Sequence, residues 1–356
     1  MEIIITSPSL DPSQNVSGIS SVTQFIIDNN KEEKYIHFEL GKKDNEKGGI
    51  FRIFPIIKNL FKWNKLLSKY PQTIIHYNFP LSKASILRDP LFIWIAQIKK
   101  HKMVIHIHGG VFLTASHIPA YLDIILKKVF SLPIPFIVLS ELEKKMLKDK
   151  FQCKNISVLP NCVDLKDAVS FQRIPNNKDT LVIGYLGRIA ETKGMNYLLE
   201  ACVKLKEKKM PFILKLAGKE EIKDQYLPLF KEKIGKQFIY EGIVSGDKKT
   251  SFLKSLDIFI LPSFFEGLPM SLLESMSFGV VPITTNVGSI GEIIKEGNNG
   301  LFILPKDSNA IVQQITKVNT NRDLLLKMSH NAKEYIINNF NVKNYIDKLN
   351  DIYTTL

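Results

Sequence analysis

The chain has 356 residues, of which 45% are hydrophobic, and a formal net charge of +13. This length favours two domains with large buried cores. No stretch reaches the ~18 consecutive apolar residues of a membrane-spanning helix, and the three cysteines lack CxxC or Cys/His spacing, which argues against a disulfide framework and a zinc site. The N-terminus, MEIIITSPS, does not resemble a signal peptide, so we expect a soluble, cytoplasmic protein.

Apolar, β-prone runs alternate with helical patterns along the whole chain, which predicts an α/β fold with parallel sheets in both halves. The loose polar segment 166–180 is the expected boundary between the halves, and helices are expected at 321–338 and 341–354. Strands are expected in the first half at 2–6, 35–39, 50–54, 73–77, 102–107, 135–139 and 155–159. Those of the second half are expected at 181–186, 212–217, 237–241, 257–261, 280–284 and 300–303.

The segment 51–102 contains ten Lys or Arg residues and one acid, Asp89. Within 55–69 (PIIKNLFKWNKLLSK), lysines recur at helical spacing among apolar residues, at positions 58, 62, 65 and 69. The pattern fits an ordinary crossover helix with lysines in water, or a basic amphipathic helix on an anionic membrane surface. We predict the membrane role, because Trp63 is hard to bury together with the other apolar residues of this helix.

The sequence HIHGG (106–110) follows a predicted strand and therefore opens at the carboxyl end of a sheet. His106 and His108 point to the same side by alternation, but His108 alone lies at the loop edge beside the glycines, so it is the candidate site residue. A His-Gly-Gly oxyanion loop of an α/β-hydrolase is the rival interpretation, yet the chain has no Gly-x-Ser-x-Gly elbow. It also has no GxGxxG fingerprint and no P-loop, which argues against nicotinamide chemistry and P-loop NTPases.

A second strand-to-helix turn carries two cations. The buried-strand pattern LVIGYLG (181–187) runs into Arg188, and Lys193 and Gly194 follow before a helical stretch. A guanidinium can bind two phosphate oxygens and an ammonium adds a point charge, so the turn suits a diphosphate. The alternative for this turn alone is a pair of solvated surface cations.

The stretch EGLPMSLLE places Glu266 and Glu274 eight positions apart, across the predicted start of a helix. Glu266 follows the strand 257–261, at a carboxyl end where ligands bind in open α/β sheets. Gly267 permits close approach of a ligand, and N–H groups at the positive end of the helix dipole would bind an anion such as a phosphate. These N–H groups belong to Leu268, Met270 and Ser271. For either glutamate alone, a capping charge is an equally good interpretation.

Together these motifs resemble the retaining glycosyltransferases of the GT-B fold, specifically glycosyltransferase family 4 (the group 1 family), whose hallmarks are E-x7-E and Gly-Arg-x4-Lys-Gly. The resemblance covers nearly the whole chain. Further similar segments are LPNCVD (159–164), LPSFFEG (261–267), VPITTNVGSIGE (281–292) and NGLF (299–302). Two departures are visible, since Cys162 replaces the usual hinge glycine and the N-terminal glycine pair is reduced to Ser17-Gly18.

The resemblance implies two Rossmann-like domains with parallel sheets facing across a cleft. The N-terminal domain (1–165) would bind the acceptor, the C-terminal domain (166–338) would bind the nucleotide sugar, and the last helix (339–356) would pack back toward the N-terminal domain. It also implies the residue roles. Glu266 and His108 would face the donor sugar, Glu274 would bind the ribose, Ile243 would lie near the base, and the diphosphate would contact Ser17, Gly18, Gly187, Arg188, Lys193, Gly267 and the helix-start amides.

The predicted function is retaining transfer of a sugar from a UDP- or GDP-sugar to a glycan acceptor, most simply a lipid-linked or surface-polysaccharide precursor such as capsule or O-antigen. No Asp-x-Asp pair is present to hold a metal, so fixed cations are expected to replace it, and no cofactor is expected beyond the donor substrate. A soluble sugar-nucleotide enzyme of the same fold, a glucan synthase or an epimerase, is the alternative. The pI of 9.4 alone suggests a nucleic-acid-binding protein, but no stacking aromatics accompany the basic stripe. We therefore expect a cytoplasmic protein peripheral to the inner face of the membrane, with no nucleic-acid partner.

Overall fold

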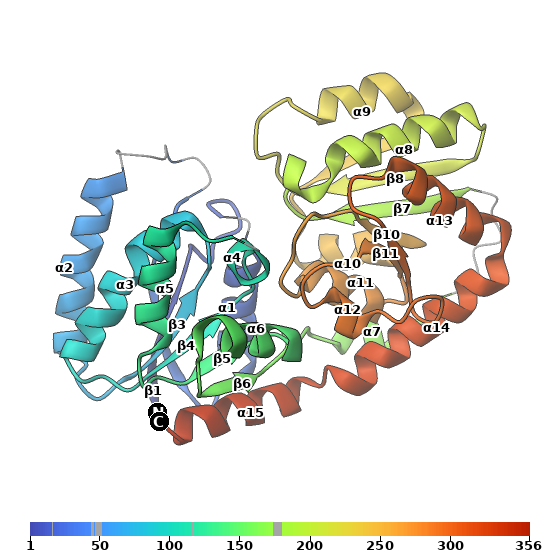
Figure 1. The fold of residues 1–356 in the computed structure, drawn as a ribbon. Coiled ribbons are helices and arrows are strands. Elements are labelled where there is room, and N and C mark those ends of the chain that lie inside the picture. The colour runs from blue at the N-terminus through green and yellow to red at the C-terminus, as the bar shows by residue number, and fades with distance from the viewer. Residues whose placement is uncertain (16, 44–45, 47–51, 116, 174–179) are drawn as a thin grey trace. The chain divides into compact units, whose positions relative to one another are not determined.

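In the computed structural model the chain forms two compact units (Figure 1). Unit 1 consists of residues 1–161 and 343–356, and unit 2 of residues 162–342. The structure describes residues 1–15, 17–43, 46, 52–115, 117–173 and 180–356.

Unit 1 is built on a six-stranded parallel sheet of order β2-β1-β3-β4-β5-β6. Its strands are β1 (Glu2–Ser7), β2 (Lys34–Glu39), β3 (Ile74–Phe79), β4 (Met103–Ile107), β5 (Phe136–Val138) and β6 (Ile156–Val158). Its helices are α1 (Gly18–Asn29), α2 (Ile53–Lys69), α3 (Lys83–Ile98), α4 (Val111–Thr114), α5 (Ala120–Phe130) and α6 (Glu141–Phe151). Both faces of β3 and β4 are buried, and apart from His76, Asn78 and His106 their residues are apolar or aromatic.

Six of the seven strands predicted for the first half are confirmed, and the strand at 50–54 is wrong. Residues 50 and 51 lie outside the described residues, and from Ile53 the chain is the helix α2. The apolar residues that face the core, among them Leu60, Trp63 and Leu67, recur every three or four positions, which is the period of a helix and not of a strand.

The prediction that Trp63 is hard to bury is also wrong, because the indole is fully buried. Its Nε1 donates a hydrogen bond to the carbonyl oxygen of Phe92 on α3 at 3.0 Å, and its ring packs on Phe38 with centroids 4.8 Å apart. A buried indole is stable where its N–H finds an acceptor, and the backbone of α3 supplies one. Trp63 therefore belongs to the core face of α2.

Unit 2 is built on a second six-stranded parallel sheet, of order β12-β11-β10-β7-β8-β9. All six strands predicted for this half are confirmed. They are β7 (Leu181–Leu186), β8 (Phe212–Ala217), β9 (Phe238–Gly242), β10 (Ile258–Leu261), β11 (Val281–Thr285) and β12 (Leu301–Ile303). The direction in which strands are added reverses between β7 and β10, and this reversal is the topological switch point at which Rossmann-type sheets bind ligands.

The helices of unit 2 cover both faces of its sheet (Figure 1). They are α7 (Lys166–Ser170), α8 (Met195–Glu207), α9 (Leu227–Ile234), α10 (Gly246–Lys254), α11 (Met270–Ser277), α12 (Ile290–Ile293), α13 (Ser308–Thr320) and α14 (Arg322–Asn339). The short α7 lies within the segment predicted to be loose. Cys162, at the start of this unit, is buried with its Sγ 3.0 Å from the carbonyl oxygen of Phe340.

The two predicted C-terminal helices are confirmed as α14 and α15 (Val342–Thr354). Residues of α15 pack on unit 1. The ring of Tyr345 meets that of Phe25 with centroids 5.6 Å apart, and the hydroxyl of Tyr353 lies 2.6 Å from Nδ1 of His76. Among the described helices, none combines the length and the apolar character needed to cross a membrane.

Candidate functional site

In unit 2, two loops leave the sheet side by side at the switch point. Arg188 and Lys193 follow β7, Glu266 follows β10, and these two strands pair directly. The Nζ atom of Lys193 lies 2.6 Å from Oε1 of Glu266, and both side chains are mostly shielded from solvent. Two of the charged groups predicted for the site are thus brought into contact across 73 residues of sequence.

The backbones of these two loops are locked together. The N–H of Phe264 donates to the carbonyl oxygen of Thr192 at 3.0 Å. Gly194 has φ +75°, and a Cβ atom there would lie 2.2 Å from the carbonyl oxygen of Pro262. Only glycine permits both the left-handed conformation and this close approach. The spacing between the loops is therefore fixed by main-chain contacts and not by the ion pair alone.

A third loop, after β11, holds the backbone of Glu266 from the other side. Gly288 has φ +56°, and a Cβ there would lie 1.9 Å from the carbonyl oxygen of Glu266. The N–H of Ser289 donates to the carbonyl oxygen of Gly267 at 3.1 Å. We call segments 187–194, 262–269 and 286–289 the switch-point loops. Gly288 could not be predicted as a site residue from the sequence pattern, because the residue it contacts, Glu266, lies 22 positions earlier in the chain.

The backbone of Arg188 is anchored by a buried tyrosine, and its side chain is paired with a glutamate. The hydroxyl of the buried Tyr185 donates to the carbonyl oxygen of Arg188 at 2.5 Å. Burial raises the pKa of the Tyr185 hydroxyl, and the nearby Glu266 carboxylate raises it further, so the phenol remains a donor. The guanidinium lies 3.6 Å from Glu221, and both side chains are about half exposed. An ion pair this exposed contributes little to stability.

The helix α11 begins at Met270, with Pro269 as its N-cap residue. The first N–H groups of a helix have no acceptor within it, so those of Met270 and Ser271 are suited to an anion. Glu274, one turn further along the same helix, forms an ion pair with Nζ of Lys249 at 2.7 Å. Lys249 lies on α10, just beyond the exposed Ile243 in the loop after β9. No motif pointed to Lys249, because only the fold brings α10 beside α11.

In unit 1, Ser17 ends the connection between β1 and α1, and Gly18 is the first residue of α1. Ser17 is the N-cap of α1, and its Oγ accepts a hydrogen bond from the N–H of Ser20 at 3.2 Å. A Cβ atom added at Gly18 would meet no atom within 4 Å. Gly18 is therefore not required by packing within this unit, and capping alone accounts for Ser17.

His108 follows β4 and is half-buried beside two other histidines. The rings of His106 and His108 lie 4.0 Å apart, and Nε2 of His76 lies 3.1 Å from Nδ1 of His106. Burial, with a smaller contribution from His76, lowers the pKa of His108 to about 3. His106 is completely buried within its strand, as predicted. Nε2 of His108 lies 2.6 Å from Oδ1 of Asn78, a residue that the sequence pattern did not single out.

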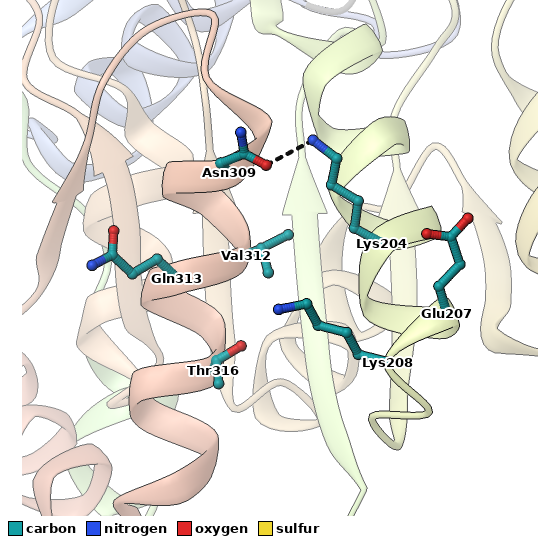
Figure 2. A pocket seen from close by; sticks show the side chains of 7 residues that line it. All are labelled: Lys204, Glu207, Lys208, Asn309, Val312, Gln313 and Thr316. Atoms are coloured by element: carbon teal, nitrogen blue, oxygen red, sulfur yellow. Dashed lines mark hydrogen bonds between the residues drawn. The ribbon is translucent and has the colours of Figure 1, made fainter.

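A groove of about 630 Å³ lies between α8 and α13 of unit 2 (Figure 2). Nζ of Lys204 bonds Oδ1 of Asn309 across it at 2.8 Å. The other lining side chains are those of Glu207, Lys208, Val312, Gln313 and Thr316, and none of these residues belongs to the predicted site. Elsewhere, the described residues contain no group of three or more His, Cys, Asp or Glu side chains placed to hold a metal ion.

Comparison with known protein families agrees with the motifs of unit 2. Residues 167–335 match the family model described as "Glycosyl transferases group 1". A curated relative in Escherichia coli, UDP-Gal:alpha-D-GlcNAc-diphosphoundecaprenol alpha-1,3-galactosyltransferase, is 27% identical over 210 residues, which is 56% of this chain and 54% of that protein. The first curated relatives are matched over only about half of their own length, 48% and 54%.

Solved structures share the fold over essentially the whole chain. Sucrose-phosphate synthase from Thermosynechococcus elongatus superimposes with a TM-score of 0.78 at 16% identity, covering 99% of this chain and 98% of that one. HepE from Anabaena, solved in complex with UDP-glucose, gives a TM-score of 0.75 at 14% identity and covers 100% of both chains. The two six-stranded parallel sheets and these neighbours confirm the predicted α/β, GT-B fold class.

Proposed function

We propose that this protein is a retaining glycosyltransferase of family 4 that moves a sugar from a nucleoside-diphosphate sugar to a hydroxyl group of a glycan acceptor. The observation that carries the proposal is the set of switch-point loops. They place Arg188, the pair Lys193–Glu266 and the start of α11 at one edge of the unit 2 sheet, inside the segment that matches the group 1 family model. Cations and helix-start amides suit a diphosphate, and a carboxylate beside them suits sugar hydroxyls.

In the proposed reaction the bond between the anomeric carbon and the diphosphate oxygen breaks while the acceptor oxygen bonds to the same face of that carbon. The acceptor's proton passes to an oxygen of the departing diphosphate, so charge and protons balance. Negative charge grows on the leaving group, and Arg188, Lys193 and the N–H groups of Met270 and Ser271 stabilise it. These fixed groups do the work of a metal ion, so transfer is independent of added metal.

Glu266 has a second role in this proposal. Its carboxylate accepts hydrogen bonds from the donor sugar, while Lys193 shares its charge between Glu266 and the diphosphate. Glu274, held by Lys249, binds the ribose hydroxyls, and Ile243 lies against the base. Ser17 and Gly18 contact the phosphates, and His108 contacts the sugar.

The acceptor in this proposal is a lipid-linked or surface-polysaccharide precursor. The similar E. coli enzyme is named for an undecaprenol-linked acceptor, and the HepE structure contains UDP-glucose, which supports a UDP-sugar among the donors to be tested. The decisive experiment offers UDP-, GDP- and ADP-sugars with an undecaprenyl-diphosphate-linked sugar acceptor and determines the anomeric configuration of the product by NMR. A product of inverted configuration, or no binding of any nucleotide sugar, contradicts the proposal. A soluble glucan or an epimerised nucleotide sugar as product identifies the alternative enzyme class instead.

Membrane attachment is part of the proposal and rests on the outer surface of unit 1. On α2 the side chains of Phe54 and Phe61 are 75% and 73% exposed, and Ile53 and Ile57 are exposed on the same outward side. The lysines at 58, 62, 65 and 69 line the adjacent side of the same helix surface. Exposed aromatic and aliphatic side chains flanked by lysines are the pattern of a helix that lies in the interface of an anionic membrane.

The helix α3 packs beside α2, and α5 packs beside α3 (Figure 1). Their exposed apolar side chains are Leu87, Leu91 and Ile98 on α3 and Tyr121 and Ile124 on α5. We call the outward sides of α2, α3 and α5 the three-helix face. Asp89, the only acid between residues 52 and 102, is buried and paired with Arg88, so it does not offset the lysines there. Large exposed apolar patches mark interaction surfaces, and the positive rim selects an anionic leaflet.

A further inference from the structure

The side-chain amide of Asn78, on β3, has one chemically possible orientation. Its Nδ2 donates to the carbonyl oxygen of Thr6 on β1 at 2.6 Å and to Oγ1 of Thr23 on α1 at 3.0 Å. A carbonyl oxygen only accepts hydrogen bonds, so the NH₂ group must face Thr6, because the flipped amide would set two acceptor oxygens against each other. Asn78 is 4% exposed, and Thr6 and Thr23 are buried as well, so water cannot replace these contacts.

The orientation of Asn78 determines where the proton of His108 resides. With Nδ2 committed to Thr6 and Thr23, Oδ1 faces Nε2 of His108 at 2.6 Å. Because Oδ1 can only accept, Nε2 must carry the hydrogen. A neutral imidazole has one donor nitrogen and one acceptor nitrogen, so Nδ1 carries the lone pair.

The surroundings keep the ring uncharged at neutral pH. His108 faces the ring of His106 on β4, lies near His76 on β3 and contacts the neutral amide of Asn78. Burial lowers the pKa of His108 to about 3, with His76 contributing in the same direction.

We infer that Asn78 is a positioning residue that fixes His108 in the Nε2–H tautomer, so that the ring offers Nδ1 as a hydrogen-bond acceptor to a hydroxyl of the donor sugar. The sugar part of this inference rests on the proposed function, whereas the tautomer does not. A neutral acceptor binds a hydroxyl but not a carboxylate. The loop after β4 therefore favours a donor sugar with a hydroxyl at the contacted position over the corresponding uronic acid, by roughly tenfold for one neutral hydrogen bond.

The tautomer is measured without any substrate. In protein labelled with ¹⁵N-histidine, two-bond ¹H–¹⁵N spectra distinguish Nε2–H, Nδ1–H and doubly protonated rings, and the signals of His108 among the seven histidines are assigned by their loss in His108→Gln. We expect Nε2–H in the wild-type protein at pH 7.5. In Asn78→Leu the proton should move to Nδ1, because Nε2–H would face an apolar side chain with no acceptor.

Thr23→Val is the matched control. It removes one hydrogen bond of the same buried amide but leaves the Thr6 carbonyl, so the amide keeps its orientation and His108 its tautomer. In kinetics with the preferred nucleotide sugar, we expect kcat/KM to fall roughly tenfold in Asn78→Leu and by less than about threefold in Thr23→Val, since one neutral hydrogen bond is at stake.

An Nδ1–H or cationic ring in the wild-type protein overturns the inference, as does an unchanged tautomer in Asn78→Leu. These results leave glycosyl transfer itself standing. If the tautomers behave as expected while the wild-type protein neither binds nor consumes a nucleotide sugar, the proposed function fails, and the assignment of a sugar hydroxyl to Nδ1 fails with it.

Discussion

The strand ends of the two units are built from opposite kinds of polar group. At the switch point of unit 2, charged side chains gather on loops whose backbones are interlocked, and Lys193 and Glu266 are in direct contact. At the strand ends of unit 1, neutral groups form a buried hydrogen-bonded network from Thr6 through Asn78 to His108. Charge suits the stabilisation of a leaving diphosphate, whereas a neutral, fixed donor and acceptor pattern suits recognition of an uncharged sugar. Because the charged loops and the neutral network lie in different units, the roles proposed for each can be tested by substitutions in separate units.

The largest effect should come from the charged loops. Glu266→Ala and Arg188→Ala should each lower turnover by about two orders of magnitude or more, the usual cost of losing one group that stabilises developing charge. Initial rates of transfer at saturating donor check this. Glu221→Gln is the control, because its exposed pairing with Arg188 makes little difference to stability, and it should stay within about threefold of wild type. Near wild-type turnover in correctly folded Glu266→Ala would remove the switch-point loops from the active site.

The free energy of unfolding should depend on pH, because a buried histidine of unit 1 stays neutral in the folded protein. His76 is buried, and its pKa is lowered from 6.5 to about 3. Since the unfolded chain binds this proton first, the stability contributed by the neutral His76 is complete above about pH 6.5 and declines as pH falls toward 3. His76 alone should then reduce the free energy of unfolding by ~2 kcal/mol between pH 7.5 and 5.0.

This pH dependence can be isolated by urea unfolding followed through tryptophan fluorescence. Both tryptophans of the chain, Trp63 and Trp94, lie in unit 1, so the signal reports that unit. His76→Asn should be less stable at pH 7.5 but should lose less stability on acidification, whereas His330→Gln, which alters an exposed histidine of unit 2, should match wild type. An unchanged pH slope in His76→Asn would show that the histidine is not held neutral.

We predict that charge reversal on the three-helix face impairs use of a lipid-linked acceptor but not donor hydrolysis. Reversing Lys58, Lys62 and Lys65 to Glu should reduce co-sedimentation with anionic vesicles at least tenfold, since each basic residue near the surface is worth about 1 kcal/mol. Activity on a lipid-linked acceptor should weaken, while donor hydrolysis should persist. The same charge reversal at Lys231, Lys233 and Lys236 of unit 2 is the control and should leave vesicle binding intact. A wild-type protein that ignores anionic vesicles even at low salt, where screening is weakest, refutes the membrane role.

The smallest expected effect is that of a chelator. If Arg188, Lys193 and the amides of α11 stabilise the leaving group, excess EDTA should change the transfer rate by less than about twofold. Assays with and without EDTA, each repeated with added magnesium or manganese, check this expectation. Loss of activity in EDTA with recovery on adding the metal would contradict the role given to these cations.

The sequence was most informative where the relevant chemistry is local. Arg188, Lys193 and Glu266 stand in short motifs beside strong strand patterns, so both their types and their loops could be predicted. Asn78 and Lys249 could not be found, because each acquires its partner only when distant elements pack together. The strand predicted at 50–54 was wrong, because from Ile53 onward the apolar residues follow the period of the helix α2. The prediction that Trp63 is hard to bury was wrong because helical periodicity shows which residues share a face of α2, but not what that face packs against. The carbonyl oxygen of Phe92, which accepts the indole hydrogen bond, belongs to another helix.

The absence of side chains at Gly194 and Gly288 limits how this candidate site can be rebuilt. Because each glycine lets its loop touch the carbonyl of a neighbouring loop, the three switch-point loops form one exchangeable module. Consider a chimera that takes only segment 187–194 from a relative of different donor preference. Its new loop would lack the main-chain contacts that fit the other two switch-point loops. Transplanting all three segments together preserves their mutual main-chain contacts. Donor preference in this scaffold should therefore be engineered, and should diverge among relatives, by coordinated replacement of the three loops.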